Sequence, residues 1–311
     1  MTELKRYRSV VADNARWDGF RFRPGDIVIS TPPKCGTTWT QMLCALLIFE
    51  DGNLPGPLTE ISPWLDMQTH ALADVVATLD AQHHRRFIKT HTPLDGLPFD
   101  ERVTYLCVGR DPRDVSVSWD HHVANFNSDS FITARAAAVG LEDLEGLTLP
   151  EPPPDDPVER FWQWADADPD PFNITTLASL LQHLATFWDR RDEDNIALFH
   201  YGDLLADLPG QVRRLGAELA IDVTDERVAE IVAAAEFDRM KENAAALAPE
   251  TDVKLWLDDQ AFFHKGTSGQ WRDLLDDADV ERYEKRVAGL APPDLAAWAH
   301  TGWLGVSSDA R

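Results

Sequence analysis

The chain has few cysteines and no long apolar run. Its 311 residues include only Cys35, Cys44 and Cys107, too few and too scattered for a disulfide framework, and no pair has metal-ligand spacing. No run of about 18 apolar residues occurs, so a membrane-spanning helix is not expected. The charged N-terminus also lacks the apolar region of a secretion signal. These absences predict a soluble protein in a reducing, cytoplasmic compartment.

Positive charge is also scarce. The chain has 29 lysines and arginines against 53 aspartates and glutamates, which gives a formal net charge of −24. General binding to nucleic acid or to an anionic membrane needs a basic face, so this balance argues against both classes of function. If the protein binds a polyanionic small molecule, its few cations must be concentrated in one place.

Short apolar runs alternate with segments of helical spacing, which predicts an α/β fold. Runs that are apolar at nearly every position are typical of parallel strands buried on both faces. The predicted strands are residues 26–30, 86–90, 103–108 and 196–200, and the predicted helices are 38–49, 112–124, 177–190, 204–218 and 226–235. We therefore expect one domain over residues 1–311, with a central, mainly parallel sheet flanked by helices. Ligands of such sheets bind beyond the carboxyl ends of the strands.

One segment interrupts this alternation. Residues 142–171 are acidic and rich in proline, yet they contain Phe161, Trp162 and Trp164. A disordered linker does not usually carry three large aromatic residues. We interpret the segment as an excursion that packs back on the body, either as a lid over the acceptor site or as a surface loop with a structural anchor.

A phosphate-binding loop is predicted where the first strand ends. Residues 30–39 join this strand to a helix, and such a junction offers unpaired backbone N–H groups and the positive end of the helix dipole to an anion. Gly36 permits tight curvature, and Lys34 adds a positive charge. The order of residues differs from the G-x-x-x-x-G-K-S/T pattern of ATP-binding loops, because here the lysine precedes the glycine.

Residues 33–39, P-K-C-G-T-T-W, resemble the P-K-S-G-T-T-W loop of the cytosolic-type sulfotransferases. The resemblance implies a P-loop-like strand–loop–helix, with 3′-phosphoadenosine-5′-phosphosulfate (PAPS) as sulfonate donor, 3′-phosphoadenosine-5′-phosphate (PAP) as product, and no metal. In that family the loop holds the 5′-phosphosulfate and its tryptophan packs on the adenine. The residues that it assigns to the donor site are Lys34, Cys35, Gly36, Thr37, Thr38 and Trp39.

The next segment, residues 89–93, ends the second predicted strand and is similar to the family's K-T-H-x-P motif. The resemblance makes His91 the general base, and a neutral imidazole suits that role because its ordinary pKa lies near neutrality. A lone histidine is usually structural, and the chain has 10, so only its position in this motif distinguishes His91. Lys34 and Lys89 would stabilise charge on the leaving phosphate and the transferring sulfonate.

Residues 110–118 follow the third predicted strand. The family pattern places an arginine and, eight residues later, a serine at the 3′-phosphate, here Arg110 and Ser118. An arginine suits phosphate because its planar guanidinium donates two hydrogen bonds at once. Without the resemblance, Arg110 and Asp111 would also fit an ordinary surface ion pair.

Weaker matches follow later in the chain. Tyr201 aligns with a tyrosine that contacts the nucleotide, and Phe237 with an aromatic residue that packs on the adenine. Residues 264–271, H-K-G-T-S-G-Q-W, are similar to the family's R-K-G-x-x-G-D-W loop, so His264, Lys265 and Gly266 are assigned to the 3′-phosphate. Together these motifs span residues 20–271 in the family's order.

Several residues depart from the family pattern. Cys35 replaces a serine, Ala235 stands where threonine is common, and His264 and Gln270 replace arginine and aspartate. These changes leave open how firmly the donor is held. The family's dimer motif is not recognisable after residue 271, so no oligomeric state is predicted.

The predicted reaction is an in-line transfer of sulfonate from PAPS to a hydroxyl of a bulky, apolar acceptor, with His91 as base. Two alternatives stay open: a phosphoryl-transfer enzyme, and a non-catalytic module that binds PAP or another nucleotide. Residues 54–58, 62–66 and 87–98 resemble an actinobacterial branch that includes glycolipid sulfotransferases, which suggests a glycolipid acceptor. Aromatic residues that could line its cleft, although a place in the core is the better default for each, are Trp64, Trp119, Phe126, Phe161 and Trp162.

Overall fold

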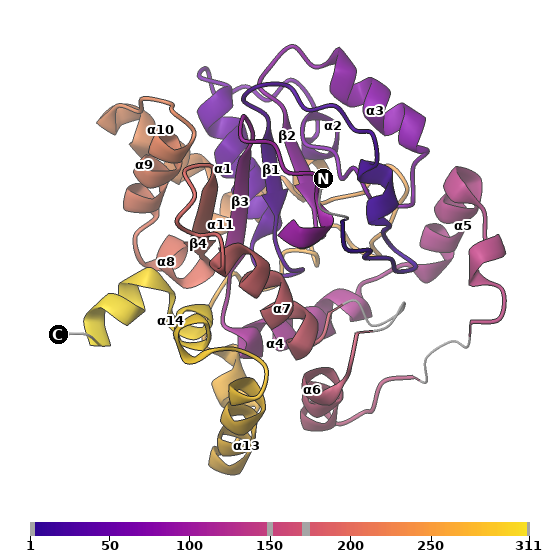
Figure 1. Cartoon of the computed structure of the whole chain (residues 1–311), viewed down its shortest axis with the longest axis vertical. Helices are drawn as coiled ribbons and strands as arrows, with labels where there is room; N and C mark the ends of the chain where they lie inside the picture. The colour runs from indigo at the N-terminus through magenta and orange to yellow at the C-terminus, as the bar shows by residue number, and fades with distance from the viewer. Residues whose placement is uncertain (1–3, 148–151, 170–174, 310–311) are drawn as a thin grey trace.

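A computed structural model describes residues 4–147, 152–169 and 175–309, and a parallel sheet lies at its centre (Figure 1). The strands are β1 (Ile27–Ser30), β2 (Phe87–Thr90), β3 (Thr104–Gly109) and β4 (Ile196–His200), in the order β2-β1-β3-β4. All of the pairs are parallel, and Ile29 of β1 lies opposite Lys89 and Leu106. The four predicted strands and the predicted α/β class are confirmed.

Helices cover both faces of the sheet. The α-helices are α1 (Thr37–Ile48), α2 (Leu58–Ile61), α3 (Leu72–Ala81), α4 (Pro112–Ala124), α5 (Ser128–Val139), α6 (Pro157–Asp166), α7 (Leu177–Trp188), α8 (Tyr201–Ala206), α9 (Leu208–Glu218), α10 (Asp225–Ala234), α11 (Phe237–Glu242), α12 (Ala244–Leu247), α13 (Asp277–Ala288) and α14 (Pro293–Asp309), the last kinked at Gly302. Short 3-10 helices are η1 (Asn14–Trp17), η2 (Leu94–Gly96), η3 (Glu142–Leu144) and η4 (Gln270–Asp273). In the described residues, no helix is both long and apolar enough to span a bilayer.

Successive residues of each strand face two separate hydrophobic clusters, as pleated strands require. Val28 and Tyr105 pack with residues of α7, α13 and α14, whereas Ile29 and Leu106 pack with residues of α1, α9 and α10. Burial of both faces explains why the strands read as continuous apolar runs. Figure 1 shows α9 and α10 together at one side of the molecule and α3 and α5 at the other.

The prediction of one helix over residues 204–218 was wrong, because the structure has two helices there. α8 ends at Ala206 and α9 begins at Leu208, on either side of Asp207. The Asp207 side chain accepts a hydrogen bond from the backbone N–H of Gly210, which makes it an N-cap, and Pro209 lies in the first turn of α9. A proline in a helix interior removes a backbone hydrogen bond, so a break at this point is favoured.

The proline-rich segment 142–171 contains helix α6. Its Phe161, Trp162 and Trp164 are buried, and the Trp162 indole N–H donates to Asp279 of α13. Residues 148–151 and 170–171 of this segment lie outside the described residues. The three aromatic side chains therefore anchor α6 to the body, and the role of the segment as a lid stays a prediction.

Candidate active site

The loop between β1 and α1 curves tightly at the carboxyl edge of the sheet. Lys34 (φ 67°) and Gly36 (φ 95°) both adopt left-handed backbone conformations. A Cβ on Gly36 would lie 2.9 Å from the ring of Tyr201, so a side chain at this position would be strained and would also collide. The first turn of α1 has no side-chain cap, and its N–H groups are left for a ligand. An anion at this helix N-terminus would satisfy them.

Arg110 connects three of the predicted segments. Its guanidinium donates to the backbone carbonyl of Lys34 at 3.0 Å and to that of Thr267 at 3.1 Å, and it lies 4.4 Å from the centre of the Tyr201 ring. The side chain is only 5% exposed, and its Nε has no hydrogen-bond partner in the described parts of the chain. A buried cation with a free N–H at the strand ends is suited to receiving an anion.

The 264–270 loop is fixed to helix α4 by a residue that the sequence interpretation did not include. The buried carboxylate of Asp114 accepts hydrogen bonds from the N–H groups of Gly269 (2.7 Å) and Gln270 (2.8 Å). At the other end of the loop, Gly266 lies against Phe237, whose ring a Cβ would approach to 2.3 Å. The loop is thus held beside the first strand–helix junction by contacts that depend on a carboxylate and a glycine.

His91 lies just beyond the end of β2, beside the β1–α1 loop. Its Nδ1 is 2.6 Å from the carbonyl oxygen of Thr31. A carbonyl can only accept, so Nδ1 carries the proton, and Nε2 of the neutral ring is free to accept one. Burial, with Lys89 nearby, holds the pKa of His91 well below its usual value, so the ring is neutral at pH 7.

A buried carboxylate holds the residues on both sides of His91. Asp66 Oδ2 accepts hydrogen bonds from the hydroxyls of Thr90 and Thr92, each at 2.6 Å, and from the indole N–H of Trp17 at 3.0 Å. Asp66 is fully buried. These bonds fix the backbone at Thr90 and Thr92, and His91 stands between these two residues in sequence. They therefore also fix where the imidazole lies.

The two predicted lysines lie close to His91, and burial weakens the charge of both. Desolvation, followed by the nearby Arg110 and Lys89, lowers the pKa of Lys34 to about 7. Its Nζ is 3.1 Å from Nδ1 of His122, a contact that no motif indicated. Desolvation lowers the pKa of Lys89 to about 8, and its Nζ lies 4.1 Å from the centre of the Trp64 ring. An anion bound here would favour the charged form of both lysines.

The other predicted donor residues differ in how closely they contact these groups. Trp39 meets Tyr201 edge-to-face at 5.4 Å, and its indole N–H has no partner among the residues that the structure describes. Thr37 contacts Thr31, and Thr38 lies in the first turn of α1. Ser118 is half-buried on α4, and Lys265 is exposed.

Cys35 and His264 have surroundings that sequence alone did not indicate. The Cys35 side chain is fully buried, and desolvation raises the pKa of its thiol to about 12, so only its backbone is available to a ligand. His264 stacks on His121 with 3.6 Å between ring centres, and its Nε2 has no partner within residues 4–147, 152–169 and 175–309. Desolvation, with His121 next, lowers the pKa of His264 to about 4. This histidine is therefore neutral at pH 7, unlike the arginine of the family pattern.

A small cleft opens beside Lys89. It is lined by Gln41, Leu58, Thr59, Ser62, Trp64, Lys89, Leu247, Pro249 and Glu250. Of the aromatic residues predicted for an acceptor cleft, Trp64 lines it, and its ring also meets His91 edge-to-face at 4.7 Å. Phe161 and Trp162 belong to the hydrophobic core instead.

Residues 24–293 match the sulfotransferase domain family. The chain belongs to the sulfotransferase family. A glycolipid sulfotransferase of Mycobacterium bovis (strain BCG / Pasteur 1173P2) is 46% identical over 98% of this chain and 97% of its own length. Human sulfotransferase 1E1 is 26% identical over 86% of this chain and 85% of its own length.

Solved structures support the same fold. Retinol dehydratase in complex with androsterone and inactive cofactor PAP has a TM-score of 0.67 at 22% identity, covering 90% of this chain and 86% of its own. Mouse sulfotransferase SULT7A1 complexed with PAP also has a TM-score of 0.67, at 17% identity, covering 94% of this chain and 97% of its own. The predicted family and enzyme class are confirmed: this sulfotransferase carries out PAPS-dependent sulfonate transfer.

Proposed function

We propose that this sulfotransferase binds PAPS across the carboxyl ends of β1 and β3 and transfers its sulfonate to an acceptor hydroxyl beside β2. The observation that carries the proposal is the placement of His91. Its protonated Nδ1 is held by the Thr31 carbonyl of the β1–α1 segment, Nε2 has no hydrogen bond within the described residues, and Lys89 is the charged residue that acts most strongly on the ring. Base, cations and helix N-terminus therefore meet at one edge of the sheet.

The donor fits the groups that the fold leaves without partners. The uncapped N-terminus of α1 suits the 5′-phosphosulfate, and Arg110, whose buried Nε lacks a partner, suits the 3′-phosphate. The free indole N–H and ring of Trp39, with Tyr201 and Phe237 nearby, are assigned to the nucleoside. Ser118, Lys265 and Gly266 complete the proposed phosphate site. This chain's own cations neutralise the donor, and the proposed reaction uses no metal.

In the proposed step, Nε2 of His91 accepts the proton of the acceptor hydroxyl as its oxygen forms a bond to sulfur. The bond from sulfur to the bridging phosphate oxygen breaks on the opposite side, and PAP leaves with that electron pair. Lys34 and Lys89 stabilise the charge on the bridging oxygen. Cys35 takes no part as a nucleophile, because burial keeps its thiol protonated.

The proposed acceptor is a hydroxyl of a lipid-linked sugar. Support comes from the glycolipid sulfotransferases that share 45–46% of their residues with this chain. The cleft beside Lys89 agrees with such a molecule, because it combines apolar residues such as Leu58 and Leu247 with polar Gln41 and Glu250.

We also propose a single domain and a reducing, cytoplasmic location. One hydrophobic cluster draws on segments from Trp17 to Ala299 and the other on segments from Ile27 to Phe263, which favours one folding unit. The three cysteines are free and buried, as is usual in a reducing compartment.

The proposal is tested by replacing His91 with asparagine. We expect His91→Asn to lower kcat for sulfonate transfer by about 10²- to 10⁴-fold, the usual contribution of a general base, and to leave PAP affinity within about twofold. The matched control is His84→Asn, near the start of β2 and away from the site. The measurements are radiolabelled sulfonate transfer and calorimetric titration with PAP and with magnesium-ATP.

Two results would contradict the proposal. Transfer that is unaffected by His91→Asn would remove the base from the mechanism. Binding of magnesium-ATP in preference to PAP would instead favour a phosphoryl-transfer enzyme.

A further inference from the structure

A buried carboxylate lies in the wall of the cleft beside Lys89, and no motif pointed to it. Glu250 is only 5% exposed and follows the end of α12, in a left-handed backbone conformation with φ of 58°. Such a conformation is costly for a residue with a Cβ, so surrounding contacts must hold it. The cleft residues around it come from α1, α2, β2 and the loop after α12.

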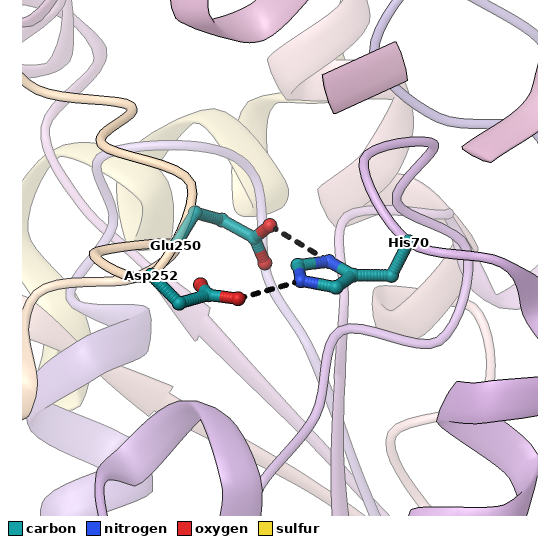
Figure 2. A group of neighbouring side chains, drawn as sticks. All are labelled: His70, Glu250 and Asp252. Carbon is teal, nitrogen blue, oxygen red and sulfur yellow. Dashed lines mark hydrogen bonds and ion pairs between the residues drawn. The ribbon is translucent and has the colours of Figure 1, made fainter. Parts of the chain in front are cut away.

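A histidine accounts for the position of Glu250. His70 Nδ1 is 3.2 Å from Glu250 Oε2, and its Nε2 is 2.8 Å from Asp252 Oδ2 (Figure 2). The hydroxyl of Thr69 also donates to Glu250 Oε2. The two carboxylates raise the pKa of His70 to about 10, so the ring is a cation at pH 7. We call His70, Glu250 and Asp252 the carboxylate clamp.

The clamp is better explained as an ion-pair cluster than as a metal site. Each nitrogen of the ring already faces a different carboxylate, as Figure 2 shows. A metal ion would have to displace the ring from at least one of them, because a metal takes the lone pair of a nitrogen that here donates a proton. The ring therefore serves to orient Glu250.

The orientation leaves one carboxylate oxygen for a ligand. Both contacts of the Glu250 side chain are to Oε2, and among the described residues none is to Oε1. Across the same cleft, Lys89 is only 4% exposed, and its Nζ contacts the Trp64 ring but has no hydrogen bond or ion pair within the described chain. A buried ammonium with free N–H groups and a buried carboxylate oxygen thus face one narrow space.

This pair of groups matches a hydroxyl. An alcohol O–H can donate to Glu250 while its oxygen accepts from Lys89, and neither group would then stay unpaired. The neighbouring Gln41 and Ser62 add further polar groups. The cavity between these groups has a volume of about 10 Å³, which is room for about one water-sized group. It therefore suits a single hydroxyl of a larger acceptor, whose ring would lie outside.

We propose that Glu250, oriented by His70, accepts a hydrogen bond from a sugar hydroxyl and selects acceptors with a polyhydroxylated head over simple aliphatic alcohols. The inference rests on the proposed function, because it places the acceptor beside His91 and Lys89. Beyond the proposed function, the inference names Glu250 as the residue that recognises the sugar part of the acceptor. A monohydric alcohol that places its one hydroxyl at His91 has none left to donate to Glu250 Oε1, and that missing hydrogen bond is the source of the discrimination.

The test compares octyl β-glucoside, below its micellar concentration, with octan-1-ol, which has the same chain and no sugar. We expect the wild-type protein to bind the glucoside at least about tenfold more tightly, since a hydrogen bond to a charged group contributes about 1.5–3 kcal/mol. Glu250→Gln should weaken glucoside binding by about tenfold and leave octanol binding unchanged. The matched control is Glu60→Gln, the same change at an exposed glutamate of α2 that does not line the cleft.

Calorimetric titrations are run with and without PAP, and a thermal melt checks that each variant is folded. Equal binding of the two alcohols, no binding of either, or a loss in Glu250→Gln that is the same for both would overturn the inference. A failure of PAP binding would instead overturn the proposed function, and the PAP-free titrations would still test Glu250. If Glu250→Gln unfolds, His70→Gln takes its place. This variant keeps Glu250 but removes the imidazole that orients it, and the same result is expected.

Discussion

The proposed donor edge and the proposed acceptor cleft of this sulfotransferase are built in different ways. The donor edge consists of short contiguous motifs at the ends of parallel strands, and much of it is backbone: the uncapped start of α1, Gly36 and the 264–270 loop. The acceptor cleft is assembled from single side chains that are far apart in sequence, from Gln41 to Glu250. A backbone site needs a particular order of residues, whereas a side-chain site needs only a shared place in space.

The donor edge should be the more sensitive of the two to a single substitution. We expect Arg110→Ala to weaken PAP binding by about 100-fold, because truncating one partner of a buried charge pair costs roughly 2–5 kcal/mol. Arg102→Ala, which removes an exposed arginine just before β3, is the matched control and should change PAP affinity by less than about twofold. Calorimetry measures both, and equal affinities in the two variants would place the 3′-phosphate elsewhere.

The pH dependence of kcat/KM for PAPS should show whether the two buried lysines act on the donor. Lys34 and Lys89 of the free enzyme have pKa values of about 7 and about 8, both lowered mainly by burial. Their charge is present below these values and is lost above them, so kcat/KM for PAPS should fall by about tenfold per pH unit between pH 7 and pH 8 and by about 100-fold per pH unit beyond pH 8. In Lys34→Arg, whose guanidinium stays charged, the fall should begin at higher pH. A profile that is flat to pH 9.5 would show that neither lysine contacts the donor.

The smallest of the expected effects is the contribution of the carboxylate clamp to the free energy of unfolding. The folded pKa of His70, about 10, lies above its unfolded value, so its contribution is fully present below about pH 6.5 and is lost as the pH rises through 10. His70 is about one third exposed, so we discount the ion pair to about 1 kcal/mol, or roughly 2 °C in Tm. Melts of wild type and His70→Asn should therefore differ at pH 6 and converge above pH 10. A difference that grows with pH would contradict the assignment of charge.

Most of the sheet could be predicted from the sequence, whereas some helices could not. Strands buried on both faces have a strong signal, and Asp111 and Pro112 mark the start of α4 directly. α13 has only Tyr283 and Val287 buried, too narrow a stripe to be recognised among its charges. α6 was hidden because its proline content suggested irregular structure, although Pro157 lies in the first turn, where a proline is compatible with a helix.

In the candidate site, too, some residues could be predicted from the sequence and others could not. The roles of Lys34, His91 and Arg110 followed from motifs, and the structure brings all three to one edge of the sheet. The carboxylates that hold the 264–270 loop and the threonines beside His91 did not follow from sequence, because Asp114 reads as an ordinary first-turn acid and Asp66 as one of many acids in the chain. Their roles depend on contacts across 24 to 156 residues, as between Asp66 and Thr90 or Asp114 and Gln270.

The enclosure of a few cations within a chain of net charge −24 has a consequence for how the donor arrives. At a distance the protein repels a polyanion, and only near the strand ends does the attraction of Lys34, Lys89 and Arg110 prevail. At physiological ionic strength the screening length is about 8 Å, so added salt weakens the long-range repulsion more than the short contacts within the site. Association of the donor should consequently become faster as salt is added, the reverse of the behaviour of a protein whose surface attracts its anionic ligand.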